Sequence, residues 1–236
     1  MTRSHGFRAP ALAAGLLAAL AFTAPPAASA PPMTEELQGA ITPAGSLQRL
    51  KEGNARFVAG KTQHRDIPTR LQETLSGQHP FAVVLGCVDS RVPPELVFDQ
   101  GIGDLFSARV AGNIVDPALL GSIEFTTKLA GANLIFVLGH TDCGAVKGAC
   151  DGVKMGNLTT TLSYIQPAVD SVQDVPGPRD SKNAAFVAAV TDANVRLTMQ
   201  AIREQSPIID ELISKGDVVL AGGVYDLASG KVTFFE

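Results

Sequence analysis

Short, wholly apolar runs separated by longer helical patterns are the feature that most constrains the fold of this chain. Residues 81–88 read FAVVLGCV and residues 133–139 read NLIFVLG, and neither run contains a charged side chain. Such runs are typical of strands buried on both faces of a sheet, which requires helices on both sides. The sequence therefore predicts an α/β fold with a mostly parallel central β-sheet flanked by helices.

The remaining patterns predict further strands and the covering helices. We expect the other strands at 104–110 and 218–220, and a hairpin at 224–236. Helices are expected at 46–58, 119–129, 143–149, 183–205 and 207–215, and a Pro-rich polar loop at 167–182. The first helix, capped by Ser46, forms an N-terminal helical arm. Its apolar stripe must pack on the chain's own core or on a second subunit, and consists of Leu47, Leu50, Phe57 and Val58.

The first thirty residues have the three-part order of a secretory signal. Arg3 and Arg8 give a basic start, residues 11–22 are small or apolar, and residues 28–30 read Ala-Ser-Ala. We therefore expect a signal peptide at 1–30, a flexible leader at 31–45 and a single domain at 46–236, and hence a periplasmic or secreted protein. A buried or interfacial helix is the alternative for residues 1–30.

Composition excludes several classes of protein. The 236 residues carry a formal net charge of −4, which argues against a nucleic-acid-binding surface. No apolar run reaches the ~18 residues of a membrane span, so no membrane association is expected after signal cleavage. Three cysteines are too few for a disulfide scaffold.

Two of the expected strands end on soft metal ligands. Cys87 closes the run at 81–88, and His140 and Cys143 follow the run at 133–139. Two thiolates and one imidazole at neighbouring strand ends can hold Zn²⁺ and leave its fourth position open, as catalytic zinc sites do. The spacing alone leaves two alternatives: a Cys87–Cys143 disulfide, or cysteines that are simply buried.

A carboxylate and a guanidinium lie next to the first of these ligands. Asp89 and Arg91 follow Cys87 by two and four residues. A carboxylate beside a metal site can accept a proton from water, and an arginine can hold that carboxylate in place and keep it ionised. The alternative is an ordinary surface ion pair, which contributes little.

Together these motifs resemble the β-class carbonic anhydrases. The resemblance rests on C-V-D-S-R at 87–91 and H-T-D-C-G at 140–144, and covers residues 46–225. Flanking segments agree with it: N-A-R-F at 54–57, D-Q-G-I-G-D-L-F at 99–106 and R-V-A-G-N at 109–113. The resemblance implies one Zn²⁺ held by Cys87, His140 and Cys143, with Asp89 and Arg91 as the catalytic pair.

The resemblance also implies a substrate pocket built at a dimer interface. Gln78, Phe106 and Gly144 match residues that contact carbon dioxide or bicarbonate in the family. Phe125 stands where many members have tyrosine, so the ring is kept and the hydroxyl is lost. The expected assembly is a homodimer or a dimer of dimers.

The expected function is zinc-dependent, reversible hydration of carbon dioxide to bicarbonate and a proton. Three alternatives stay open at this point. One is a related zinc hydrolase of carbon disulfide or carbonyl sulfide, since only pocket access would differ. The others are a non-catalytic zinc-binding or redox-sensing protein and a metal-free interaction module.

Overall fold

The computed structural model describes residues 1–2 and 29–235. The signal peptide predicted for residues 1–30 therefore lies almost wholly outside the described residues. The strands are β1 (Ala82–Gly86), β2 (Leu105–Arg109), β3 (Leu134–His140), β4 (Val219–Tyr225) and β5 (Val232–Phe234). The helices before β3 are α1 (Glu35–Ala40), α2 (Pro43–Val58), α3 (Ile67–Glu73), α4 (Pro94–Val97), η1 (Ala111–Asn113), α5 (Pro117–Glu124) and η2 (Phe125–Leu129). The helices after it are α6 (Gly144–Cys150), α7 (Leu158–Ser163), α8 (Gln166–Ser171), α9 (Ala184–Gln205) and α10 (Pro207–Lys215).

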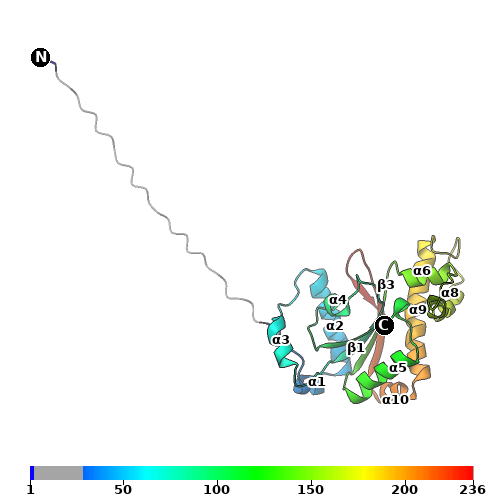
Figure 1. The fold of residues 1–236 in the computed structure, drawn as a ribbon, viewed down its shortest axis with the longest axis horizontal. Coiled ribbons are helices and arrows are strands. Elements are labelled where there is room, and N and C mark those ends of the chain that lie inside the picture. The colour runs from blue at the N-terminus through cyan, green and yellow to red at the C-terminus, as the bar shows by residue number, and fades with distance from the viewer. Residues whose placement is uncertain (3–28, 236) are drawn as a thin grey trace.

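The five strands form one mostly parallel sheet in the order β2-β1-β3-β4-β5, which confirms the predicted fold class (Figure 1). Only β5 is antiparallel to its neighbour, and it pairs with β4 as the predicted hairpin. The two apolar runs are adjacent strands, since β1 pairs with β3 in parallel register. Their carboxyl ends therefore lie side by side, and the predicted metal ligands follow at this edge of the sheet.

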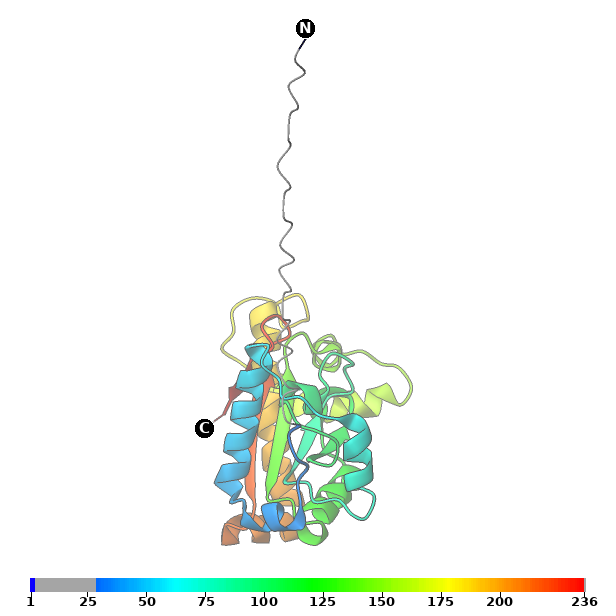
Figure 2. The ribbon, with the colours of Figure 1, turned by 90° about the vertical axis from the view of Figure 1, so that its left-hand side faces the viewer.

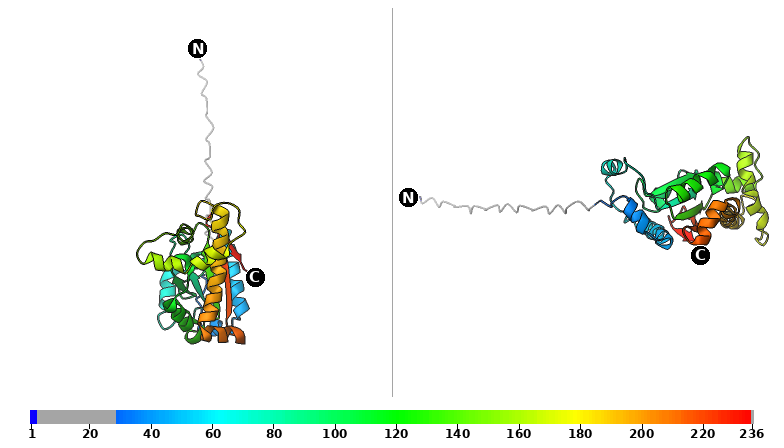
Figure 3. Two further views of the ribbon diagram at one scale, coloured as in Figure 1. Left: turned by 90° about the vertical axis from the view of Figure 1, so that its right-hand side faces the viewer. Right: turned by 90° about the horizontal axis from the view of Figure 1, so that it is seen from below.

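Helices cover both faces of the sheet. Figure 2 shows α2 along one face, and the left panel of Figure 3, from the opposite side, shows α9 along the other. Val84 and Phe136 pack in the core on the α2 side, whereas Val83 and Ile135 pack in the core on the α9 side. Alternate residues of β1 and β3 thus face different helices, which explains why both strands are apolar throughout.

The apolar stripe of the predicted N-terminal helix packs mainly on the chain's own core. Leu50 is fully buried, and Leu47 and Phe57 pack against the same cluster, while Val58 is exposed. The helix begins earlier than predicted because Thr42, not Ser46, is its N-cap and Pro43 follows in the first turn.

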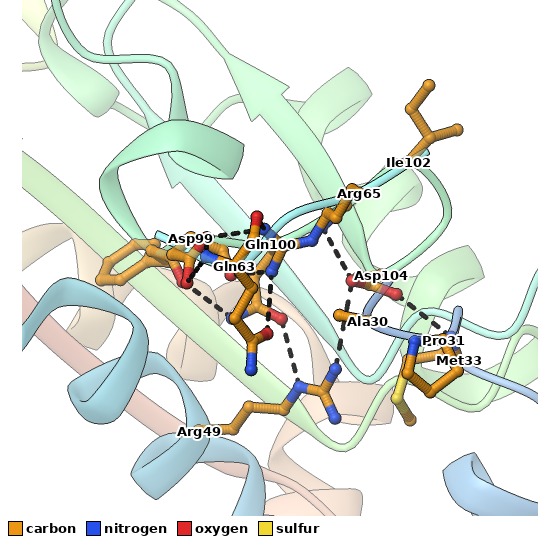
Figure 4. Close-up of polar contacts among 12 residues, drawn as sticks. Ala30, Pro31, Met33, Arg49, Gln63, Arg65, Asp99, Gln100, Ile102 and Asp104 are labelled. Carbon is orange, nitrogen blue, oxygen red and sulfur yellow. Dashed lines mark hydrogen bonds and ion pairs between the residues drawn. The ribbon is translucent and has the colours of Figure 1, made fainter. Parts of the chain in front are cut away.

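The expectation of a flexible leader at 31–45 does not match the structure. The backbone N–H of Met33 donates to Asp104 Oδ1 at 3.1 Å (Figure 4). Arg70 Nη2 donates to the carbonyls of Ala30 and Pro31 at 3.1 and 2.8 Å. Arg70 and Asp104 are themselves buried and paired at 3.0 Å. The Pro- and Gly-rich composition predicted flexibility, but this buried ion pair binds the backbone of the segment.

Helix α1 lies within the same segment and is held in the same way. Gln38 Nε2 donates to the carbonyls of Pro80 and Ala130, both at 2.8 Å. Thr34 accepts a hydrogen bond from the N–H of Leu37 and caps the helix. Residues 33–45 are therefore part of the folded unit.

A second buried carboxylate fixes the turn before β2. Asp99 accepts hydrogen bonds from Arg56 and Arg65, both at 2.6 Å. Burial alone would raise the pKa of Asp99, but these two guanidinium groups hold it below its ordinary value. The segment 99–104, part of the motif D-Q-G-I-G-D-L-F, thus connects helix α2 and the loop that follows it to the sheet through these hydrogen bonds.

The predicted loop at 167–182 is only partly a loop. Helix α8 occupies its first residues, with Pro167 in the first turn, where proline is tolerated, and Ala168 and Val169 buried. The long helix at 183–205 is confirmed as α9, capped by Asn183. Within the described part of the chain, no helix has both the length and the apolar character needed to cross a membrane.

Candidate metal centre

Three predicted ligands meet at the carboxyl edge of the sheet. Cys87 directly follows β1, His140 is the last residue of β3, and Cys143 directly precedes α6. Because Gly86 pairs with Leu138 across β1 and β3, the first two ligands lie on adjacent strand ends. The turn between the other two passes through Asp142, whose φ of 58° lies in the left-handed region that aspartate tolerates.

The geometry of the sulfurs excludes the disulfide alternative. Sγ of Cys87 and Sγ of Cys143 are 3.9 Å apart, and both cysteines are free. A disulfide requires about 2.05 Å. Two sulfurs bound at about 2.3 Å to one tetrahedral zinc lie about 3.8 Å apart, close to the observed separation. The ligand atoms of the two cysteines and His140 all lie within 4.8 Å of one another.

The imidazole of His140 is oriented for ligation. Its Nδ1 lies 2.9 Å from the carbonyl oxygen of Thr141, which fixes the proton on Nδ1. Its Nε2 is buried and has no hydrogen-bond partner among the described residues. A buried polar atom without a partner is costly, and a metal ion would satisfy it.

The pKa values of the two thiols shift in opposite directions. A hydrogen bond from Cys143, with a further one from the N–H of Gly112, holds the pKa of Cys87 below its ordinary value although burial would raise it. The pKa of Cys143 is raised by its contact with Cys87 and by burial. Burial alone would lower the pKa of His140, but the adjacent Cys87 thiolate raises it above its ordinary value. The cluster thus holds thiolate charge that a cation can neutralise.

These observations fit Zn²⁺. Two soft sulfurs and one imidazole, all buried, form a Cys₂His donor set with three protein ligands. Three ligands leave one tetrahedral position for water or substrate, which distinguishes a catalytic from a structural zinc site. The residues that would hold the ion are Cys87, His140 and Cys143.

Asp89 lies beside this cluster and accepts hydrogen bonds from Arg91. Arg91 donates from Nε and its backbone N–H to Oδ1, both at 2.9 Å, and from Nη2 to Oδ2 at 2.7 Å. These bonds hold the pKa of Asp89 well below its ordinary value. Oδ2 is 3.9 Å from Nε2 of His140, so an ionised carboxylate faces the metal ligands.

The model of the carbonic anhydrase family matches residues 82–232, the part of the chain that carries all of these groups. The chain belongs to the β-class carbonic anhydrases. Carbonic anhydrase 2 of Mycobacterium tuberculosis is 38% identical over 192 residues, which make up 80% of this chain and 91% of that protein. The family resemblance seen in the motifs is therefore confirmed.

Solved structures of this class share the fold. The beta-carbonic anhydrase CcaA matches with a TM-score of 0.64 and 27% identity, over 80% of this chain and 87% of that one. One of two tetrameric beta-carbonic anhydrases from the ascomycete Sordaria macrospora matches with a TM-score of 0.62 and 25% identity, over 71% and 86% of the two chains.

The sequence did not identify the groups that position Cys87 and Asp89 in this carbonic anhydrase. Arg109, at the end of β2, donates to the carbonyls of Cys87 and Asp89 at 2.8 and 2.5 Å. Gly112 donates its N–H to Cys87 Sγ at 3.4 Å. Both lie in the R-V-A-G-N segment quoted for the resemblance. Asn194, which bonds to Gly112, was recognisable only as a polar residue within an apolar helical pattern.

The predicted pocket residues divide into two groups. Gly144, the first residue of α6, follows Cys143 and has open space beside its Cα. Phe106 on β2 lines a cavity of about 230 Å³ with residues of α5 and η2, and Phe125 is half exposed at the start of η2. Gln78 is exposed before β1, whereas Cys87 follows the opposite end of that strand. One chain therefore does not bring Gln78 to its own metal ligands.

We expect the purified chain to bind about one Zn²⁺, because its three buried ligands form a single cluster. Cys87→Ser and His140→Ala should each lose most of the metal, measured by atomic emission spectrometry after desalting. Cys150→Ser is the matched control, because Cys150 lies at the far end of α6 outside the cluster. Full zinc occupancy in both ligand variants would contradict the assignment.

Proposed function

We propose that this chain catalyses the reversible hydration of carbon dioxide to bicarbonate and a proton at the Cys87–His140–Cys143 centre. The observation that carries the proposal is the position of Asp89: its Oδ2 faces His140 Nε2 at 3.9 Å while Arg91 holds the carboxylate from the other side. A centre that only stored metal would not need such a pair. When bound, Zn²⁺ supplies the Lewis acidity that lowers the pKa of water towards ~7.

Asp89 accepts the hydrogen bond from the attacking water and fixes its orientation. Its low pKa keeps the carboxylate ionised near neutral pH, so it acts as an acceptor and not as a donor. The two thiolates of the donor set weaken the Lewis acidity of the metal relative to three imidazoles. This makes the contribution of the Asp89–Arg91 pair larger. Arg109 maintains the position of Asp89 by binding its backbone carbonyl.

Gly144 supplies a backbone donor on the substrate side. As the first residue of α6, its N–H has no carbonyl one turn earlier to bind. Such a group can stabilise an oxygen of carbon dioxide as negative charge develops. The family resemblance assigns the apolar wall to Phe106 and Phe125 and a further donor to Gln78; because the cavity lined by Phe106 contains none of the metal ligands of its own chain, we propose that a second chain completes the pocket.

Asp89→Asn should retain zinc and lower kcat for hydration by about 100-fold or more, because an uncharged amide accepts a weaker hydrogen bond from the attacking water than a carboxylate does. The measurement is stopped-flow carbon dioxide hydration with zinc quantified on the same sample. Asp170→Asn is the control: it makes the same substitution on α8, at an exposed side chain that accepts a hydrogen bond from Gln166 and belongs neither to the metal cluster nor to the Asp89–Arg91 pair. A parent rate in Asp89→Asn would contradict the role of Asp89.

We further propose that the active unit is a homodimer built around the edge strand β2, with a dimer of dimers as the larger assembly. Large exposed apolar side chains belong to elements near this edge: Leu71, Leu75, Leu96, Phe125 and Leu129. Gln78, remote from its own centre, is available to a second chain. The tetrameric Sordaria relatives support an assembly larger than the monomer.

A mixed dimer tests this arrangement. If Gln78 serves the partner's centre, mixing Gln78→Ala with Cys87→Ser chains creates heterodimers in which one of two sites is intact. After complete subunit exchange, activity should rise to about one quarter of the parent value, because half the dimers are mixed and each has one good site. Hydration activity equal to the mean of the separate variants would contradict a site shared between subunits, and an active monomer by light scattering would contradict the dimer.

We propose that the chain is exported, on the basis of the signal-like residues 1–30. The expected result of cell fractionation is a cleaved, periplasmic or secreted protein whose intact mass lacks most of this segment. The basic start, apolar run and small residues near Ala30 support export. Full-length chain recovered from the cytoplasm would contradict it.

A further inference from the structure

Asn194 is a buried amide on α9 that binds the backbone beside the metal centre. Its side chain is 2% exposed and is surrounded along the helix by apolar residues such as Val190 and Val195. Its Nδ2 donates to the carbonyl oxygen of Gly112 at 2.8 Å, across 82 residues of sequence. A buried amide is retained where its hydrogen bonds have a specific purpose.

Gly112 links this amide to a metal ligand. Its carbonyl accepts from Asn194, and its own N–H donates to Cys87 Sγ at 3.4 Å. Its φ of 74° is in the left-handed region, and a Cβ there would lie 2.5 Å from Cδ1 of Ile165. The residue is therefore confined on three sides: by Asn194, by Ile165 and by the sulfur.

A hydrogen bond to a metal-bound thiolate withdraws electron density from the sulfur. The sulfur then donates less charge to the metal, and the metal is a stronger Lewis acid. This matters most in a donor set with two thiolates. The orientation of the Gly112 N–H is set by the φ and ψ of that residue, and the bond from Asn194 restrains them.

We propose that Asn194 is a positioning residue of the zinc centre, which holds Gly112 so that its N–H stays directed at the Cys87 sulfur. Asn194 does not touch the metal or the substrate. The inference rests on the Cys₂His centre and not on the reaction proposed above. Its test therefore uses a spectroscopic signal of the metal–sulfur bond.

The first experiment loads the parent chain, Asn194→Ser and Asn194→Ala with Co²⁺ and records the sulfur-to-cobalt charge-transfer absorption. Both substitutions are smaller than asparagine, so neither overpacks the core. Losing the restraint weakens the hydrogen bond to sulfur, so the absorption should shift to longer wavelength in both variants. Thr198→Val is the control, because Thr198 is similarly buried one turn further along α9.

Bands of the Asn194 variants that coincide with those of the parent would overturn the proposal. An equal shift in Thr198→Val would also overturn it, because general loosening of α9 would then suffice. A second measurement needs no variant and covers the case of poor folding. In the parent loaded with ¹¹³Cd²⁺, the amide proton of Gly112 should show scalar coupling to the metal through the sulfur, and its absence would overturn the proposal.

Discussion

The parallel pairing of β1 with β3 is the constraint on which the rest of the site depends. Gly86 is in register with Leu138, so Cys87 and His140 leave the sheet on adjacent strands at the same edge. The chain then needs only one short turn to return Cys143 to the same point. A one-residue slip would move every side chain of β1 or β3 to the opposite face and disrupt its packing in both halves of the core, so the packing on the two faces specifies this register. The metal centre is thus a consequence of the core.

At these strand ends, hydrogen bonds to backbone carbonyl and amide groups orient the metal ligands and the loop that carries Asp89. Thr141 fixes the tautomer of His140, Gly112 reaches the sulfur of Cys87, and Arg109 binds the loop between Cys87 and Asp89. Each contact uses a backbone group whose place is set by the end of a strand or a short helical turn. A ligand set held in this way depends little on flexible side chains, which favours a reproducible geometry.

Local patterns in the sequence were sufficient to predict the elements that depend only on residues close together in the chain. The apolar runs identify β1 and β3, helical spacing identifies α2 and α9, and the order of a parallel sheet brings the strand ends together. Spacing alone left zinc, a disulfide and simple burial open, and the 3.9 Å sulfur separation with the unpartnered Nε2 of His140 decides for metal. The ordered segment at 33–45 and the Asn194–Gly112 bond were not predictable, because each depends on hydrogen bonds between residues tens of positions apart.

Each negative charge at the centre is compensated by a different kind of group. The two sulfurs are buried, and burial would favour their neutral forms unless a cation or hydrogen-bond donors compensate. The thiol of Cys143 and the N–H of Gly112 stabilise the Cys87 thiolate from inside the protein. Asp89 is also anionic and close by, and like charges would repel, but Arg91 neutralises it from the solvent side, where its guanidinium is 52% exposed. Groups in the interior therefore stabilise the metal ligands, and a group at the surface stabilises the Asp89 carboxylate. This division lets an ionised carboxylate stand 3.9 Å from a metal ligand without a hydrogen bond to it.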